Sequence, residues 1–213
     1  MLYITGDTHG ELRRFTAECL PCAEWATEDS LIVAGDFGCV FYQDQRDEQK
    51  LDALAQLPFR VLFLDGNHEA FPAIRAYPEE EWNGGRIHRL RDNVLHLMRG
   101  QVYTLEGLKL FTMGGGYSID RWLRVPGKSW WPEEMPSDTD YEEAWRNLDA
   151  HGRKVDFLIS HAAPWETMEL FRQQGIFSRT FPEERPLQDF LEAVRQSVAY
   201  RHYYFGHLHM DRQ

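Results

Sequence analysis

The chain has 213 residues, of which 43% are hydrophobic and 14% aromatic, so it has enough apolar material for the core of a globular domain. Its 34 acidic and 23 basic residues give a formal net charge of −11, and the pI is about 5.3. Such a surface repels phosphate backbones, so we expect no broad, nonspecific binding to nucleic acid. A bound metal ion would reverse the charge locally, which leaves an anionic substrate open at one site.

The sequence shows no apolar stretch of membrane-spanning length and no signal peptide, since it starts directly with strand-like residues. We therefore expect a cytoplasmic protein with reduced thiols and no membrane contact. Cys19 and Cys22 have the spacing of a zinc or redox pair. The two further ligands of a zinc knuckle do not follow them, so we interpret both as structural.

Three short apolar stretches in the first seventy residues, over 2–5, 31–34 and 59–64, are typical of buried strands. Between them we predict helices over 11–25 and 44–57, because apolar residues recur there at helical spacing. Strands that alternate with helices in this way predict a parallel sheet and an α/β fold.

The middle of the chain has a looser pattern, with turn residues at 82–85 and irregular alternation over 86–97 that indicates short strands. Two strand-like stretches follow, over 102–105 and 108–113, and the Glu-Gly pair between them predicts a hairpin. The remaining predicted elements are helices over 139–150 and 186–198 and strands over 155–159 and 200–205. We expect a single domain over 1–213, whose sheet would continue with one more strand after the C-terminus.

Residues that bind metals or carry protons follow five of the predicted strands. In chain order they are Asp7 and His9, Asp36, Asn67 and His68, His161, and His207 and His209. Ligands of α/β sheets bind outside the carboxyl ends of the strands, so we expect these side chains to converge. Imidazole nitrogens mixed with carboxylate and amide oxygens suit manganese, iron or zinc.

The set is too large for one ion with an open position, and it therefore predicts two. Two ions roughly 3.5–4 Å apart suit an in-line displacement at phosphorus. Asp36 is the natural bridging ligand, because one carboxylate has two oxygens. The alternation of an extended strand end lets Asp7 and His9 point at one ion, and the spacing of His207 and His209 does the same.

Five motifs in this chain resemble those of the calcineurin-like metallophosphoesterases. They are GDTHG (Gly6 to Gly10), GDFG (Gly35 to Gly38), GNHE (Gly66 to Glu69), SHAAP (Ser160 to Pro164) and GHLH (Gly206 to His209). The resemblance implies a four-layer α/β/β/α sandwich with a dinuclear metal site at the carboxyl ends of the strands. It also implies hydrolysis of a phosphomonoester or phosphodiester by a hydroxide that bridges the metals.

The resemblance further implies a role for each motif residue. One ion would be held by Asp7, His9, Asp36 and His209. The other would be held by Asp36, Asn67, His161 and His207. His68 would act near the leaving group as a general acid or by stabilising charge, and Glu69 would support these groups from behind. The resemblance gives Asp65 no role, but as the neighbour of GNHE it is a candidate for the support that other members have after the position of Asp36. Both ions would be divalent, with manganese expected first and iron or zinc as alternatives.

Departures from the family patterns bear on the substrate. GDTHG and GNHE are similar to the Ser/Thr protein phosphatases, but those carry GDxVDRG where residues 35–41 read GDFGCVF. The aspartate that supports the catalytic histidine and the adjacent phosphate-binding arginine are therefore missing. GNHEAF followed by Trp82 resembles the RNA lariat-debranching enzymes, which have cysteine in place of Asp7. The GGGYSIDR and SWWPEE stretches within 114–134 resemble bacterial and phage metallophosphoesterases.

A phosphate-binding arginine is expected near the metals, because the guanidinium fork matches phosphate oxygens. The candidates are Arg99, Arg121 and Arg124. Arg121 is best placed, since it follows three glycines at the end of a strand, and Ser118 in the same loop would contact substrate or cap the turn. Trp130 and Trp131 would stack on a planar group or pack in the core.

The leading hypothesis is a phosphoesterase whose substrate is a small molecule, a phosphoprotein or a nucleic-acid end. A Ser/Thr-type phosphoprotein phosphatase and a nuclease are the alternatives within this chemistry. A non-catalytic scaffold that binds partner proteins would be expected to have lost metal ligands or His68, and all of them are present.

Overall fold

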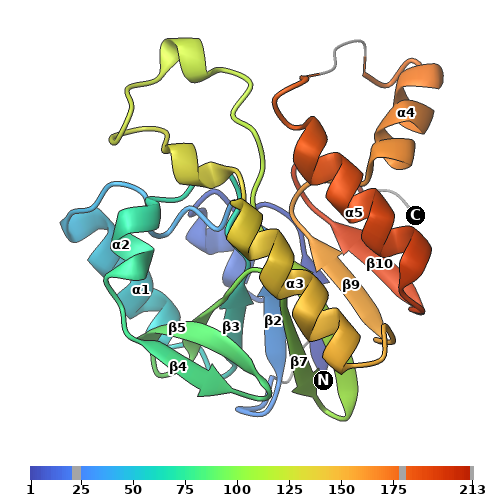
Figure 1. The fold of residues 1–213 in the computed structure, drawn as a ribbon. Helices are drawn as coiled ribbons and strands as arrows, with labels where there is room; N and C mark the ends of the chain where they lie inside the picture. The colour runs from blue at the N-terminus through green and yellow to red at the C-terminus, as the bar shows by residue number, and fades with distance from the viewer. Residues whose placement is uncertain (21–24, 178–180, 212–213) are drawn as a thin grey trace.

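Two β-sheets pack face to face in the computed structural model, which describes residues 1–20, 25–177 and 181–211 (Figure 1). The six-stranded sheet contains, in spatial order, β1 (Leu2–Thr5), β2 (Ser30–Val33), β3 (Arg60–Phe63), β6 (Val94–Leu97), β5 (Gly85–Arg91) and β4 (Glu79–Trp82). The four-stranded sheet contains β10 (His202–Phe205), β9 (Phe157–Ser160), β8 (Leu108–Met113) and β7 (Gln101–Leu105). The helices are α1 (Gln45–Ala55), α2 (Phe71–Arg75), α3 (Asp138–Ala150), α4 (Trp165–Gln173) and α5 (Arg185–Ser197), with 3-10 turns at Leu12–Phe15, Arg121–Leu123 and Pro132–Glu134.

Helices cover the outer face of each sheet, so the expected four-layer α/β/β/α sandwich is confirmed (Figure 1). Side chains alternate along β2, where Val33 packs with Leu51 of α1 while Ile32 lies between the sheets with Ile159 of β9. On the far side, α3 and α5 pack on the four-stranded sheet in a separate cluster that includes Leu148. None of the described helices is long and apolar enough to cross a membrane.

The parallel strands of each sheet end at the same edge. β1, β2 and β3 run parallel, with Val33 in register with Thr5 and Phe63, and β8, β9 and β10 also run parallel. The Nδ1 atom of His161 lies 2.9 Å from the carbonyl oxygen of Ala34, and this contact joins the strand ends of the two sheets. The loops that follow these strands therefore meet in one place.

Most predicted elements are confirmed. The helices over 44–57, 139–150 and 186–198 correspond to α1, α3 and α5, and both predicted turns connect hairpins, β4–β5 and β7–β8. We did not predict α2, α4 or β4 from the sequence.

The helix predicted over 11–25 is wrong within the described residues, where only a 3-10 turn at Leu12–Phe15 forms. Thr16 ends that turn in an extended conformation, and its hydroxyl donates to the carbonyl oxygen of Arg13 at 2.8 Å. Side-chain bonds of this kind compete with the helical ladder, and a proline at position 21 could not have donated to it. Cys19 is exposed, whereas Cys22 lies outside the described residues.

A buried ion pair lies under the six-stranded sheet's carboxyl edge. Asp65 accepts hydrogen bonds from Nε of Arg99 at 2.8 Å and lies 3.1 Å from Nε2 of His96. Burial opposes the charge on Asp65, but Arg99 and His96 outweigh it and hold the pKa of this carboxyl far below its usual value. Removal of either partner would therefore destabilise the folded protein, because the other charge would be left buried and unpaired.

Replacing Arg99 with Met should lower the free energy of unfolding at pH 7 by about 3–5 kcal/mol, because the Asp65 charge loses its buried partner. The lowered pKa of Asp65 stabilises the fold above the pKa of an unfolded aspartate, so the difference between the two proteins should shrink in acid. Urea unfolding in EDTA, followed by circular dichroism at several pH values, measures both effects. Arg153→Met removes an exposed pair with Asp149 and should change the free energy of unfolding little, because solvent screens this pair; an equally small change for Arg99→Met would contradict the role of the buried pair.

Candidate metal centre

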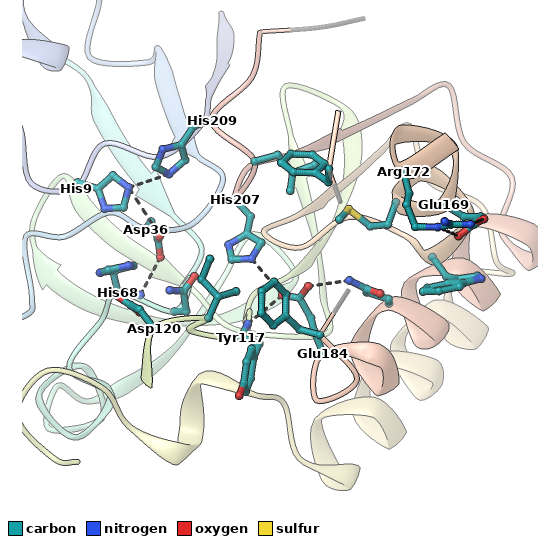
Figure 2. Close-up of a pocket in the computed structure, with 18 of the residues that line it drawn as sticks. His9, Asp36, His68, Tyr117, Asp120, Glu169, Arg172, Glu184, His207 and His209 are labelled. Atoms are coloured by element: carbon teal, nitrogen blue, oxygen red, sulfur yellow. Dashed lines mark hydrogen bonds and ion pairs between the residues drawn. The ribbon is translucent and has the colours of Figure 1, made fainter. Parts of the chain in front are cut away.

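Four of the predicted metal ligands form one tight group at the carboxyl ends of β1, β2 and β10 (Figure 2). They are Asp7, His9, Asp36 and His209, and one ligand atom from each lies within 4.8 Å of every other. The Nε2 atom of His209 lies 3.0 Å from Oδ2 of Asp7 and 3.1 Å from Nε2 of His9. Asp36, His161 and His207 form a second group at the same spacing, so Asp36 belongs to both. Asn67 joins the second group, with its Oδ1 atom 3.2 Å from Nε2 of His161.

The backbone is unusual at these positions. Of the eight non-glycine residues with positive φ in the described chain, four are predicted ligands, namely His9, Asp36, His207 and His209. Left-handed backbone costs energy for residues with a Cβ, and it clusters at sites where function requires it. Glycines allow the close approach of the loops, since a Cβ on Gly66 would lie 2.1 Å from Oδ1 of Asp36. The loops are thus folded to aim side chains inward.

His161 shows that a cation fits the second group. Its Nδ1 atom faces the carbonyl of Ala34 and must carry a hydrogen, which leaves Nε2 as the ligand atom. That Nε2 atom lies 3.4 Å from Oδ1 of Asp36 and 3.2 Å from Oδ1 of Asn67. A lone pair and two oxygen acceptors that face one another repel, and a positive ion among them removes the repulsion.

The surroundings of Asp7 indicate that a cation also fits the first group. Its Oδ1 atom accepts from the backbone N–H of His207 at 2.8 Å. Its Oδ2 atom is buried, and it accepts no hydrogen bond from the described residues. A buried carboxylate oxygen without a donor is costly, and the imidazoles of His9 and His209 lie beside it. Both groups therefore fit divalent ions of the type that imidazole and carboxylate select.

Glu69 and Ser118 hold the ligands from behind. The buried carboxylate of Glu69 accepts from the backbone N–H groups of Gly38 (3.2 Å) and Gly66 (2.6 Å), so it ties two motif loops together. Ser118 is buried and accepts from the amide nitrogen of Asn67 at 3.1 Å, which turns the amide oxygen toward His161. Ser118 thus contacts Asn67, a predicted metal-binding residue. Asp65 contacts Arg99 and His96, as described above.

Among the three candidate arginines, Arg124 is the one that lines the pocket at the centre. Its Nη2 atom donates to Nε2 of His68 at 3.0 Å, and its Nε atom is held by Asp120 at 2.6 Å. Arg121 instead donates to the buried Glu134 at 2.7 Å, and Arg99 is occupied by Asp65.

His68 lies between this arginine and the metal ligands. Its backbone N–H donates to Oδ1 of Asp36 at 2.8 Å, and its ring contacts that of His9 edge-on, with centroids 5.1 Å apart. Burial and the charge of Arg124 lower the pKa of His68 to about 4, against the pull of Asp36. The imidazole is therefore neutral over most of the pH range.

The tryptophan pair divides between two environments. Trp131 is buried and packs edge-on against Phe41, with ring centroids 5.6 Å apart. Trp130 lies against the guanidinium of Arg121, 4.6 Å from its ring centre. Packing is thus the role that the structure gives to Trp131.

A profile of the calcineurin-like phosphoesterase family matches residues 2–211. The chain belongs to this family. A lariat debranching enzyme of Drosophila pseudoobscura pseudoobscura is 24% identical over 242 residues, a match that covers 97% of this chain and 42% of that protein. The chain thus spans less than half the length of this relative.

Glu184 is a residue that the sequence reading did not identify. Its carboxylate lies 3.2 Å from Nε2 of His207 and also accepts from the backbone N–H of Tyr117 at 3.0 Å. Burial opposes a positive charge on His207, but Glu184 outweighs it and raises the pKa of His207 to about 9. Glu184 is thus a carboxylate beside a predicted metal ligand, and a contact of this kind orients the imidazole ring.

Replacing Glu184 with Gln should reduce the protons released when manganese binds. In the metal-free protein His207 holds a proton below pH 9, so binding at pH 7.5 must displace it. Without this carboxylate, burial lowers the pKa of His207 and only Asp36 and Asp7 still raise it, so proton release per chain should fall. A pH indicator in weak buffer measures the release on mixing with MnCl2. Glu183→Gln alters an exposed neighbour and should change nothing; equal release by both variants would contradict this role of Glu184.

Proposed function

We propose that the protein is a metal-dependent phosphoesterase that hydrolyses a phosphomonoester or phosphodiester with two divalent ions, manganese being the first choice. The observation that carries the proposal is the pair of ligand groups that share Asp36 and adjoin His68 and Arg124. One ion would be held by Asp7, His9, Asp36 and His209. The other would be held by Asp36, Asn67, His161 and His207. The free thiols of Cys19 and Cys39 favour a reducing, cytoplasmic setting.

The bound ions would supply an activated water as nucleophile and neutralise charge on the phosphoryl oxygens. The protein would orient the ligand atoms before the ions bind. Asn67 presents its oxygen because Ser118 takes its amide nitrogen, and His161 presents Nε2 because the Ala34 carbonyl takes its other nitrogen. Preorganised groups of this kind lower the barrier because they need not reorient during the reaction.

Arg124 and His68 would act together on the oxygen of the leaving group. The pKa of about 4 favours a neutral His68 at pH 7, so the positive charge at this position comes from Arg124. Of the two roles expected for His68, stabilisation of developing charge therefore receives more support than proton donation. Arg124 also supplies, from a different part of the chain, the arginine that is missing after Asp36.

A nucleic-acid phosphodiesterase is the second candidate. The similarity to a lariat debranching enzyme over nearly the whole chain favours it. The net charge of −11 disfavours binding along a polymer, although an end or a branch point could still reach the metals.

The test is a hydrolysis panel with Mn²⁺ that covers bis-p-nitrophenyl phosphate, p-nitrophenyl phosphate, cyclic nucleotides, a phosphopeptide and a branched RNA. Mass spectrometry of the metals should find close to two divalent ions per chain. Asp36→Asn should lose both metal and turnover, whereas the exposed Asp189→Asn should retain them. A protein that binds no divalent ion, or hydrolyses no member of the panel, would refute the proposal.

Arg124→Ala should lower kcat by about 10²-fold, the size of effect seen when a donor to developing charge is removed. Its manganese content should stay unchanged, because the hydrogen bonds of Arg124 go to Asp120, Ser129 and His68, none of which is a predicted metal ligand. Arg124→Lys should recover part of the loss, since it keeps the charge without the two-pronged contact. Lys128→Ala removes an exposed cation near by and serves as the control; an equal effect of Lys128→Ala would point to general surface charge instead.

A further inference from the structure

A cavity of about 380 Å³ extends from the metal centre toward α4 (Figure 2). Its lining includes large apolar side chains from α4 and from the residues that follow this helix, which we call the apolar wall. They are Trp165, Met168, Phe177 and Phe181. The family motifs contribute none of these residues, and the proposed hydrolysis at phosphorus does not require them. The apolar wall therefore calls for an explanation of its own.

One face of α4 forms part of this wall. Trp165, Met168, Glu169 and Arg172 recur at helical spacing, and all four line the cavity. None of the residues of α4 is buried, so this face does not contribute to the core. Polar contacts with α5 hold the helix in place, among them an ion pair between Glu166 and Arg195. The guanidinium of Arg185 covers part of Trp165, 3.6 Å from its ring centre, whereas Met168 and the part of Trp165 that lines the cavity are available to a ligand.

The apolar wall and His68 lie at different ends of the cavity. Figure 2 shows His68 with His9 and His209 at one end and Glu169 and Arg172 at the other, with His207 and Glu184 between them. Arg124 and His68 would receive the oxygen of the leaving group. A group bound at the apolar wall would then be a second organic substituent on the same phosphorus, and it would stay attached after hydrolysis.

The charges near the wall indicate what this second group would be. Glu169 lies at this end of the cavity and forms an ion pair with Arg172 at 2.5 Å, and Glu184, between the two ends, is paired with His207. Among the described lining residues the wall therefore offers no unpaired cation to a further phosphate, as would be needed for a continuing nucleic-acid chain. Aromatic and thioether side chains instead favour an uncharged planar ring, through stacking and apolar burial.

We propose that the apolar wall binds the retained ester group of a small phosphodiester, and that this group carries an uncharged planar ring such as a nucleobase or an aryl ring. The inference rests on the proposed phosphoesterase function and narrows it to diesters. In the reaction a P–O bond forms from water and the P–O bond to the leaving group breaks. One proton from the water ends on the leaving oxygen, and the products are an alcohol and a monoester whose ring remains at the wall.

The test uses p-nitrophenyl phosphodiesters that share one leaving group and differ only in the second group, which is methyl, phenyl or thymidine 5′-yl. The ring-bearing esters should have kcat/KM values at least about tenfold above the methyl ester, mainly through KM, because the ring leaves water. The monoester p-nitrophenyl phosphate should be the poorer substrate. Equal values for methyl and ring-bearing esters, or a preference for the monoester or for branched RNA, would overturn the inference while leaving a phosphoesterase.

A matched pair of variants locates the effect. Met168→Ala shortens a side chain in the apolar wall, whereas Leu170→Ala shortens an exposed side chain on the same helix that does not line the cavity. Met168→Ala should reduce the preference for the ring severalfold with kcat little changed, and Leu170→Ala should preserve it. Circular dichroism checks that both variants fold. Loss of the preference in both variants, or in neither, would contradict the wall as the binding site.

A binding measurement separates the subsite from the reaction. Phenylphosphonate and methylphosphonate are not cleaved, and calorimetry with the manganese-loaded protein gives their Kd values. Phenylphosphonate should bind about tenfold more tightly, and Met168→Ala should remove most of the difference. If no ester is hydrolysed but this difference is found, the proposed function fails and the subsite stands. If hydrolysis occurs but the two phosphonates bind equally, the subsite fails alone.

Discussion

The carboxylate of Asp36 is the contact on which the whole site depends. It is almost fully buried, and it lies between the ligands that come from the two sheets. Its Oδ1 atom accepts from the backbone N–H of His68 and faces His161, while Oδ2 faces His9. A buried carboxylate needs positive charge or donors around it, so Asp36 constrains the three loops that carry His9, His68 and His161. The two sheets bring these loops to one edge, and their contacts with Asp36 determine how closely they approach one another.

The sequence predicted the parts of the protein that follow a strict local rule. Apolar runs that end in Asp7, Asp36 or Asn67 indicate strands, and parallel strands bring their ends together whatever lies between them. That rule predicted the convergence of side chains from Asp7 to His209, which the structure brings together. A different rule, the helical spacing of apolar residues, predicted the helix over 11–25, and this prediction was wrong within the described residues. The hydroxyl of Thr16 bonds to the backbone there and opposes the helix.

The supporting residues could not be predicted, because their partners are set by packing across the sandwich. Glu184 precedes α5 and reaches His207 from more than twenty residues away, with no motif around it. Arg121 is nearer to the three glycines and was the better candidate by position, but its guanidinium donates to the buried Glu134. Arg124, three residues later, reaches His68 instead. Such assignments depend on side-chain direction within a loop, which spacing alone does not encode.

The segments that would set specificity contribute little to the core. The loops of the predicted ligands contain left-handed backbone at four of these residues, and contacts such as that of Glu69 with Gly66 hold them in place. By contrast, α4 has no buried residue, and Trp122, in the segment that carries Arg124, is 81% exposed. A segment with few buried contacts can change its side chains at small cost in stability. Under the proposed function, the separation of the predicted metal ligands from a weakly packed wall would allow the side chains of the wall to change while the ligand groups stay in place.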